Sequence, residues 1–192
     1  MRARITAAVG LVAVLALAGC ATSDGLAGDY AGGGGTVSAD GAYLELAPTE
    51  RAAPVEFGGP TVDGDELDSA QLAGSITVVN FWYAGCPPCR LEASSLASLS
   101  TEFPDVAFVG VNIYDTAEVA ASFEREFGIE YPSILDAGTG AVQLAFAGQV
   151  APNAVPTTLI LDTDGRVAAR ISGVIRDPAI LRSMIETVQE RG

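Results

Sequence analysis

The sequence predicts an α/β domain built on a mixed central sheet, and three observations support this expectation. Between residues 54 and 192, apolar runs rich in β-branched and aromatic residues alternate with segments of helical periodicity. The last two apolar runs are separated by the turn sequence Asp162-Thr163-Asp164-Gly165, which indicates an antiparallel hairpin. The stretch is long enough for one compact domain with a sizeable core.

Each element in the first half of this domain follows from a local pattern. Residues 61–67 predict a small hairpin, with the turn-forming pair Asp63-Gly64 at its centre. Residues 75–83 (SITVVNFWY) form a continuous apolar run that is typical of a strand buried on both faces. Residues 86–103 carry apolar side chains at spacings of three and four and end before Pro104, which predicts a helix.

The second half of the domain repeats this alternation. Gly128 ends the next helical pattern, and an inner apolar face marks the helix that closes the chain. The Asp-x-Asp-Gly segment lacks the further oxygen ligands and the late Glu of an EF-hand loop, so we expect a turn there and not a calcium site. We expect strands at 106–113, 131–135, 157–161 and 166–172, and helices at 116–127, 141–147 and 177–190.

The composition excludes most catalytic machinery. The 192 residues include no His, and all ten basic residues are Arg, so Lys is absent as well. A Ser-His-Asp or Cys-His centre, an imidazole metal site, a Schiff-base lysine and a Walker lysine are therefore excluded. Cysteine remains as a nucleophile that is active at neutral pH, and the chain has three.

The charge distribution argues against two kinds of partner. The net charge of −14 repels both the phosphate backbone of nucleic acids and anionic lipid head groups. Residues 20–70 hold ten of the 24 acidic residues but only one arginine, Arg51. We therefore expect a solvated segment followed by an acidic globular domain, and no nucleic-acid partner.

The N-terminus has the pattern of a targeting segment. A start with two arginines is followed by an apolar run over residues 5–18, too short for a membrane span of ~20 residues. The run ends in Leu17-Ala18-Gly19-Cys20, which resembles the lipobox of bacterial lipoproteins. This resemblance implies a lipoprotein signal peptide at 1–19, a lipidated Cys20 and a protein anchored on the extracytoplasmic face of the cell membrane. A plain secretory signal or an uncleaved anchor is the alternative.

A tether follows the predicted signal peptide. Residues 20–53 are rich in Gly, Ala, Ser, Asp and Thr, with four consecutive glycines at 32–35, and they show no helical or strand period. A flexible linker of ~30 residues has a reach of roughly 30 Å. We therefore expect a flexible tether at 20–53 and a folded domain at 54–192.

The two remaining cysteines form a pair that can carry redox chemistry. The sequence Cys86-Pro87-Pro88-Cys89 lies where a strand ends and a helix begins, and a helix N-terminus stabilises a thiolate. We expect Cys86 to be the exposed attacking thiolate and Cys89, one turn into the helix, to be the resolving thiol. A static disulfide and a zinc site are the alternatives. Such a short loop gains little loop entropy from a disulfide, and two thiols without His cannot complete a structural zinc site.

Residues 80–90 (NFWYAGCPPCR) resemble the active-site segment of the thioredoxin superfamily, and residues 55–188 resemble its extracytoplasmic TlpA/ResA branch. The resemblance implies a thioredoxin-like fold, with an N-terminal hairpin, an inserted strand-helix element and no cofactor besides the Cys86–Cys89 disulfide. Glu92 stands at the family's spacing, and the segment around Pro156 resembles the cis-proline loop, which offers backbone groups to an extended substrate. The substrate contacts that it implies are Trp82, Pro87, Pro88, Val155 and Pro156.

Three residues, Asn80, Gly85 and Ser94, depart from the family's pattern, and Ser94 stands where many relatives have a helix-kinking Pro. Asn80 stands where thioredoxin has a buried Asp that accepts the proton of the resolving thiol, and Asn cannot accept it. In the TlpA/ResA branch a carboxylate after the next strand takes this role, which implies Asp115. The same residue also suits a helix N-cap, so both readings stay open. Gly85 replaces the tryptophan usually found next to the first cysteine, which leaves that cysteine less covered.

These features together predict a membrane-tethered thiol-disulfide oxidoreductase that acts as a reductase. The resemblance implies protein disulfides as substrates, those of apocytochrome c among them, and a membrane thiol carrier as the electron donor. A thiol peroxidase on the same fold is one alternative, although Val79 and Tyr83 stand where peroxiredoxins need Pro and Thr or Ser. A non-enzymatic surface lipoprotein that binds a partner is the other.

The two prolines of the motif predict a reducing dithiol. Neither Pro87 nor Pro88 can donate an N–H to the Cys86 sulfur, so the thiolate is less stabilised and the disulfide relatively favoured. We expect a reduction potential nearer the roughly −270 mV of thioredoxin than the roughly −120 mV of DsbA. Equilibration with dithiol buffers measures the potential, and a value as oxidising as that of DsbA would contradict the prediction.

Overall fold

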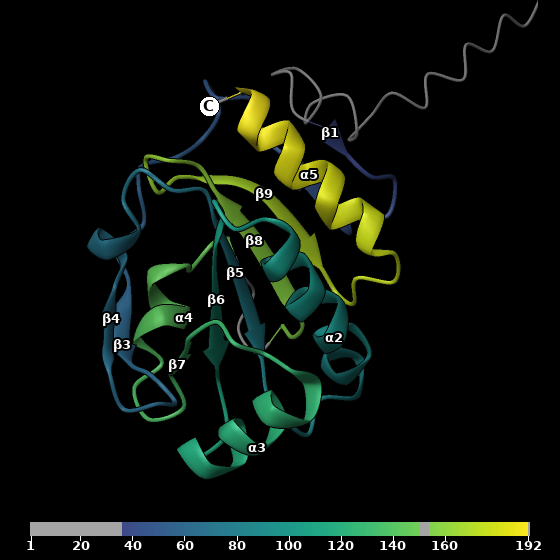
Figure 1. Cartoon of the computed structure of the whole chain (residues 1–192). Helices are drawn as coiled ribbons and strands as arrows, with labels where there is room; N and C mark the ends of the chain where they lie inside the picture. The colour runs from purple at the N-terminus through teal and green to yellow at the C-terminus, as the bar shows by residue number, and fades with distance from the viewer. Residues whose placement is uncertain (1–35, 150–153, 192) are drawn as a thin grey trace, which may run out of the picture.

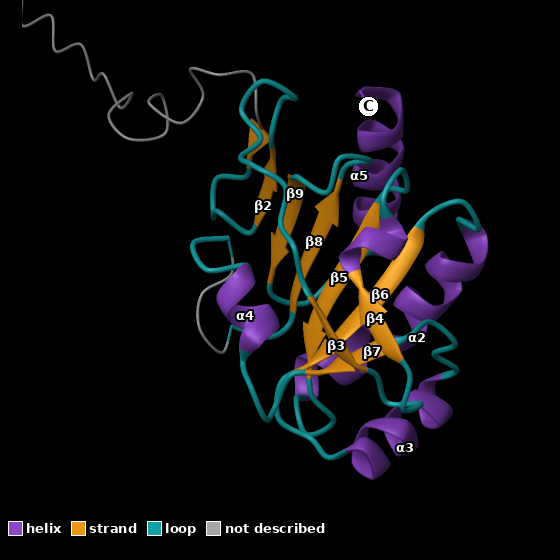
Figure 2. Ribbon diagram, turned by 90° about the vertical axis from the view of Figure 1, so that its left-hand side faces the viewer, coloured by secondary structure: helices purple, strands orange, loops and turns teal. Residues whose placement is uncertain are grey.

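The structure is a computed structural model that describes residues 36–149 and 154–191. The predicted signal peptide, Cys20 and the first part of the predicted tether lie outside these residues. Within them, seven strands form one sheet in the order β1-β2-β9-β8-β5-β6-β7, and a separate pair, β3 and β4, forms a hairpin (Figures 1 and 2).

The elements lie close to the ranges that the sequence predicts. The strands of the main sheet are β1 (Thr36–Val37), β2 (Tyr43–Glu45), β5 (Thr77–Trp82), β6 (Ala107–Asn112), β7 (Ser133–Leu135), β8 (Thr157–Leu161) and β9 (Val167–Ser172). The hairpin is β3 (Gly58–Pro60) and β4 (Glu66–Asp68). The helices are α2 (Pro87–Glu102), α3 (Ala117–Phe127), α4 (Ala141–Ala145) and α5 (Pro178–Arg191), with a 3-10 turn, η1 (Ser69–Leu72). In the part of the chain described here, no helix is long and apolar enough to cross a membrane.

The central strand β5 is buried along its whole length. It pairs in parallel with β6, from Thr77↔Ala107 to Trp82↔Asn112, and antiparallel with β8. β6 pairs in parallel with β7, and β8 pairs antiparallel with β9. The mixed sheet and its closing hairpin are therefore confirmed, and β7 with α4 supplies the predicted strand-helix insertion.

Successive residues of β5 point to opposite faces of the sheet and belong to different cores. Val78 packs with residues of α2 and α5, whereas Val79 and Phe81 pack with the hairpin and α4. Trp82, at the end of β5, joins a third cluster with α2 and α3. Figure 2 shows the same division, with α2, α3 and α5 behind the sheet and the hairpin and α4 in front of it.

Part of the segment predicted as a tether belongs to the folded domain. Residues 36–53 are expected in the tether, but β2 pairs antiparallel with β9 and carries β1 on its outer edge. Strands of two and three residues are too short to show a period, so their composition resembles that of a linker. The folded domain therefore includes residues from Thr36 onward, and its predicted boundary at residue 54 is too late.

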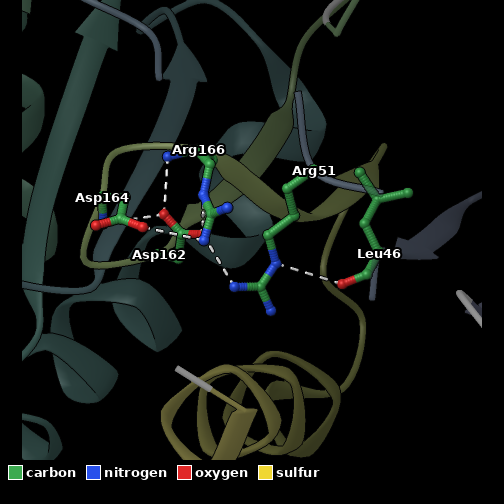
Figure 3. A network of polar contacts seen from close by, with 5 residues as sticks. All are labelled: Leu46, Arg51, Asp162, Asp164 and Arg166. Carbon is green, nitrogen blue, oxygen red and sulfur yellow. Dashed lines mark hydrogen bonds and ion pairs between the residues drawn. The ribbon is translucent and has the colours of Figure 1, made fainter. Parts of the chain in front are cut away.

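A buried ion pair fastens this N-terminal segment to the turn between β8 and β9. Arg51 Nη1 donates to Asp162 Oδ2 at 2.9 Å, and both side chains are about 1% exposed. Asp162 also accepts a hydrogen bond from Arg166 Nε at 2.9 Å (Figure 3). Burial opposes the charge of Asp162, but the hydrogen bonds and guanidinium charges of the two arginines outweigh it and lower the pKa of the carboxyl. The carboxylate of Asp162, the first Asp of the Asp-x-Asp-Gly turn, is therefore engaged in ion pairs with two arginines.

The predicted hairpin is present, with its first strand displaced toward the N-terminus. The strands pair from Gly58↔Asp68 to Pro60↔Glu66, so the loop spans residues 61–65 and is longer than Asp63-Gly64 alone. Gly64 has a φ of +90°, a conformation that glycine adopts without a steric penalty. Thr61 forms a bridge with Ile134 of β7, so the hairpin protects that edge of the main sheet.

Replacing Arg51 with Met should destabilise the protein, because it leaves Asp162 buried with one cation fewer. Removing one member of a buried pair typically costs 3–5 kcal/mol, and Arg166 remains, so we expect the free energy of unfolding to fall by about 2–3 kcal/mol at pH 7. The pKa of Asp162 is lowered in the folded chain, so this contribution is complete above the ordinary value of 3.8 and disappears as the pH falls below it. Urea denaturation at pH 7 and at acid pH measures both effects.

Arg182→Met is the matched control. Arg182 pairs with Glu102 at 2.6 Å, but these side chains are 37% and 43% exposed. Exposed pairs contribute less than about 1 kcal/mol. Equal losses in the two variants would contradict the assignment of the Arg51 pair as an anchor.

Candidate active site

Cys86 and Cys89 lie at the junction of β5 and α2 and are joined in a disulfide, with an S–S distance of 1.98 Å. Cys86 is the N-cap residue of α2, and the backbone N–H of Cys89 donates to its sulfur at 3.1 Å. Pro87 and Pro88 open the helix, where an N–H would have no helical partner. Over residues 36–149 and 154–191, no three His, Cys, Asp or Glu side chains are grouped so that they could hold a metal ion.

Both cysteines are buried, each with about 2% of its surface exposed. This differs from the expectation that Cys86 is exposed and that Gly85 leaves it less covered. The Cys86 sulfur is bonded to that of Cys89 and lies in an apolar cluster between β5, α2 and α3, so the oxidised site is closed. The other buried members of this cluster are Trp82, Ala93, Ala120 and Phe123, and the partly buried residues against it include Val62, Tyr83, Ala84 and Val155.

The peptide bond between Val155 and Pro156 is cis, as the resemblance implied. It immediately precedes β8, and the Val155 side chain packs against the cluster that contains the disulfide. The carbonyl of Pro156, a buried residue, accepts the N–H of Gly173 at 2.9 Å. Among the expected substrate contacts, Pro87 is exposed, and Pro88 and Val155 are half-buried. These three side chains are therefore accessible to a partner.

Trp82, the single tryptophan of the chain, does not reach the surface. It is 3% exposed and stacks on Phe123 of α3, with the ring centroids 4.4 Å apart. A Cβ atom at Gly110 of β6 would lie 2.8 Å from the indole Nε1, so the glycine makes room for this ring. Burial against α3 makes Trp82 part of the packing around the disulfide, and its expected contact with a substrate stays a prediction.

Asp115 holds the loop that carries Cys86. Its Oδ2 accepts the backbone N–H of Ala84 at 2.6 Å and the side-chain amide of Asn112 at 2.8 Å. The N-cap of α3 is Thr116, so the alternative reading of Asp115 as the helix cap is wrong. The carboxylate thereby connects the end of β6 to the loop before α2, while its role as a proton acceptor stays a prediction.

Glu92 is a second carboxyl of the site, one helical turn after Cys89 and 1% exposed. Its Oε1 accepts the side-chain amide of Asn80 at 3.0 Å, and its Oε2 accepts the N–H of Ile175 at 2.7 Å. Burial raises the pKa of Glu92 to about 7, against the smaller lowering effect of these two hydrogen bonds. A carboxyl with this pKa can take and release a proton near neutral pH.

The buried pair of Asn80 and Glu92 supplies a carboxyl group next to the strand position where thioredoxin has an Asp. Asn80 donates from Nδ2 both to Glu92 and to Thr158 Oγ1, each at 3.0 Å, so an amide occupies the strand and the acid comes from α2. Glu92 is not among the site residues expected from the sequence, although its spacing from Cys89 matches that of the family. Its position four residues before Leu96 places it on the apolar face of the helix, and a lone acid on such a face is the signal that points to it.

Glu92 should make the stability of the oxidised protein fall as the pH rises from 4.5 to 7. The unfolded carboxyl loses its proton near its ordinary pKa of 4.5, whereas the folded one keeps it up to a pKa of about 7. The free energy of unfolding therefore falls by roughly 1.4 kcal/mol per pH unit over this window. Glu92→Gln removes the titration and should flatten the dependence. Urea denaturation of both proteins across this pH range measures it, and identical slopes would refute the assignment.

Comparisons with known proteins agree with this geometry. Residues 49–170, more than half of the chain, match the AhpC/TSA family. The thiol:disulfide interchange protein HelX of Rhodobacter capsulatus is 32% identical over 140 residues, which cover 72% of each chain. The thiol-disulfide oxidoreductase ResA of Bacillus subtilis is 27% identical over 120 residues, which cover 62% of this chain and 64% of ResA.

Solved structures show the same fold. A DsbF homologue from Corynebacterium diphtheriae superposes with a TM-score of 0.69 and 29% identity, over 79% of this chain and 96% of that one. A thiol:disulfide interchange protein of the thioredoxin family from Chlorobium tepidum superposes with a TM-score of 0.65 and 27% identity. The match covers 72% of this chain and 96% of that one. The predicted thioredoxin-like fold is confirmed. The chain belongs to the AhpC/TSA family and is a thiol-disulfide oxidoreductase.

Proposed function

We propose that this protein is a membrane-tethered reductase of disulfides in extracytoplasmic proteins. The observation that carries the proposal is a Cys-x-x-Cys disulfide at the N-terminus of α2, with a cis-proline loop packed against the same cluster. A helix N-terminus favours the thiolate of Cys86, and the loop before β8 offers backbone beside it for an extended substrate.

The proposed reaction exchanges one disulfide for another. In the reduced protein the Cys86 thiolate attacks a substrate disulfide, forms a mixed disulfide and releases the first substrate thiolate. The Cys89 thiol then loses its proton and attacks the Cys86 sulfur, which closes the Cys86–Cys89 disulfide and releases the second thiolate. Two electrons pass to the substrate, which leaves as a dithiol once protons are taken up.

The second step needs an acceptor for the proton of Cys89, and the site offers two carboxyl groups. Asp115, expected from the sequence, already accepts two hydrogen bonds and fixes the loop. Glu92 lies on the same helix as Cys89, and its pKa of about 7 suits exchange with a thiol at neutral pH. We infer that Glu92 takes the proton and that Asp115 serves chiefly to position Cys86.

The anchor, the substrates and the electron donor are proposed from the sequence. The lipobox-like segment before Cys20 supports a diacylglycerol anchor on the outer face of the membrane, with residues 1–19 removed. The resemblance to the TlpA/ResA branch supports protein disulfides as substrates, apocytochrome c among them. It also supports a thiol carrier of the membrane as the source of electrons.

Trapping of mixed disulfides tests the proposed function. In Cys89→Ala, the Cys86 thiolate can attack a substrate but cannot be released by the resolving step, so covalent adducts should accumulate. Non-reducing electrophoresis followed by mass spectrometry of the adducts identifies the partners.

The double variant Cys86→Ala/Cys89→Ala is the matched control, because it keeps Cys20 and removes the redox pair. Adducts in Cys89→Ala that are absent from the double variant support the proposal. No adduct on Cys86 would favour a protein that binds its partner without chemistry.

A further inference from the structure

The backbone of Ala84, in the loop before the disulfide, is held from two sides. Its N–H donates to Asp115 Oδ2 at 2.6 Å, and its carbonyl accepts a hydrogen bond from Arg90 Nη1 at 3.4 Å. Asp115 comes from the connection between β6 and α3, whereas Arg90 is in the first turn of α2. Two different segments, the β6–α3 connection and α2, therefore fix the residue two positions before Cys86.

Arg90 is itself held against α3. Its guanidinium donates from Nη2 to Glu126 Oε1 and lies over the ring of Phe127, with the central carbon 4.9 Å from the ring centroid. The same carbon is 5.6 Å from the ring centroid of Phe123. Planar stacking combined with several directed N–H groups is a geometry that Arg can adopt and Lys cannot.

Phe123 connects Arg90 to the cluster around the disulfide. Phe123 stacks on Trp82 at 4.4 Å, and both belong to the cluster that encloses the two cysteines. The backbone N–H of Arg90 also donates to the carbonyl of Cys86 at 3.2 Å. Arg90 therefore contacts the loop, the N-cap residue of α2 and the helix that packs over the site.

We propose that Arg90 is a positioning residue for the dithiol, and that it acts by its shape and hydrogen bonds. This inference rests on the proposed redox function of Cys86. Glu126 neutralises the guanidinium charge, so the long-range effect of Arg90 on the thiolate is small. The Arg90 clamp, consisting of Arg90 with Ala84, Glu126 and Phe127, keeps the loop closed over the buried Cys86. Releasing the clamp opens the loop and exposes the disulfide.

Reduction of the full-length oxidised protein by dithiothreitol tests the clamp. Arg90→Lys keeps the charge and loses the stacking and the hydrogen-bond geometry, while Arg90→Met keeps only the apolar stem. Both variants should be reduced faster by roughly tenfold, because a locally opened loop admits the small thiol. Thiol labelling measures the rate, and Trp82 fluorescence follows it independently because this tryptophan lies in the cluster around the disulfide.

Arg182→Lys is the matched control. Arg182 donates to both carboxylate oxygens of Glu102, at the far end of the same helix α2. The disulfide of the Arg182→Lys variant should be reduced at the wild-type rate within about twofold, since this surface pair contributes little to stability. Urea midpoints of all variants show whether a rate change comes from the site or from global unfolding.

Three outcomes overturn the proposal. If Arg90→Lys is reduced at the wild-type rate and Arg90→Met at an altered rate, the charge of Arg90 controls the rate of reduction. If both variants are reduced at the wild-type rate, the clamp has no effect on the disulfide. A rise in rate that matches the loss of global stability would show ordinary destabilisation. Glu126→Gln, which keeps the shape of the partner and removes its charge, should shift the rate in the same direction by a smaller factor. The measurement uses no protein substrate, so it is independent of the trapping experiment with Cys89→Ala.

Discussion

The sulfur of Cys86 capping helix α2 is the interaction on which the rest of the site depends. The cap places the disulfide at the N-terminus of α2, where the aligned peptide dipoles give a positive partial charge. The N–H of Cys89 donates to the Cys86 sulfur. This requires β5 to stop at Trp82 and the chain to turn within four residues, 83–86. Pairing of β5 with β6 and β8 along its length fixes that end point. The position of the sulfur is therefore set by the register of the sheet as much as by the cysteine motif.

The closure of the site follows from the same junction. Because Trp82 and the two cysteines fall on the α2 and α3 side of the sheet, the aromatic residues of α3 cover them. An Asp at position 80 would face the buried carboxyl of Glu92. The amide found there donates to Glu92 and Thr158 and lets one acid remain buried without a neighbouring negative charge.

The sequence predicts those features that depend on local pattern and misses those that depend on distant partners. β5 and α2 follow from an apolar run and a helical period, and their ends lie within two residues of the predicted ones. β1 and β2 are missed because two or three residues show no period, and they become strands only through pairing, β2 with β9 and β1 with β2. The burial of Cys86 and Trp82 was missed because it depends on how α3 packs, which no local signal reveals. The cis bond before Pro156 was anticipated through family resemblance.

Two buried carboxyl groups show how partners decide what an acid does in this fold. Asp162 and Glu92 are each about 1% exposed, and each accepts several hydrogen bonds. Asp162 receives them from Arg51 and Arg166 as well as from backbone groups, so its pKa is lowered and the charge is kept as an anchor for the N-terminal segment. Glu92 receives only neutral N–H groups, one from an amide and one from the backbone, so burial prevails and its pKa rises to about 7. The carboxylate that keeps its charge thus lies at the turn between β8 and β9, and the carboxyl with the raised pKa lies on α2, three residues after Cys89. In a chain without His, Glu92 is therefore a group near the start of α2 that titrates close to neutral pH, as its proposed role in proton transfer requires.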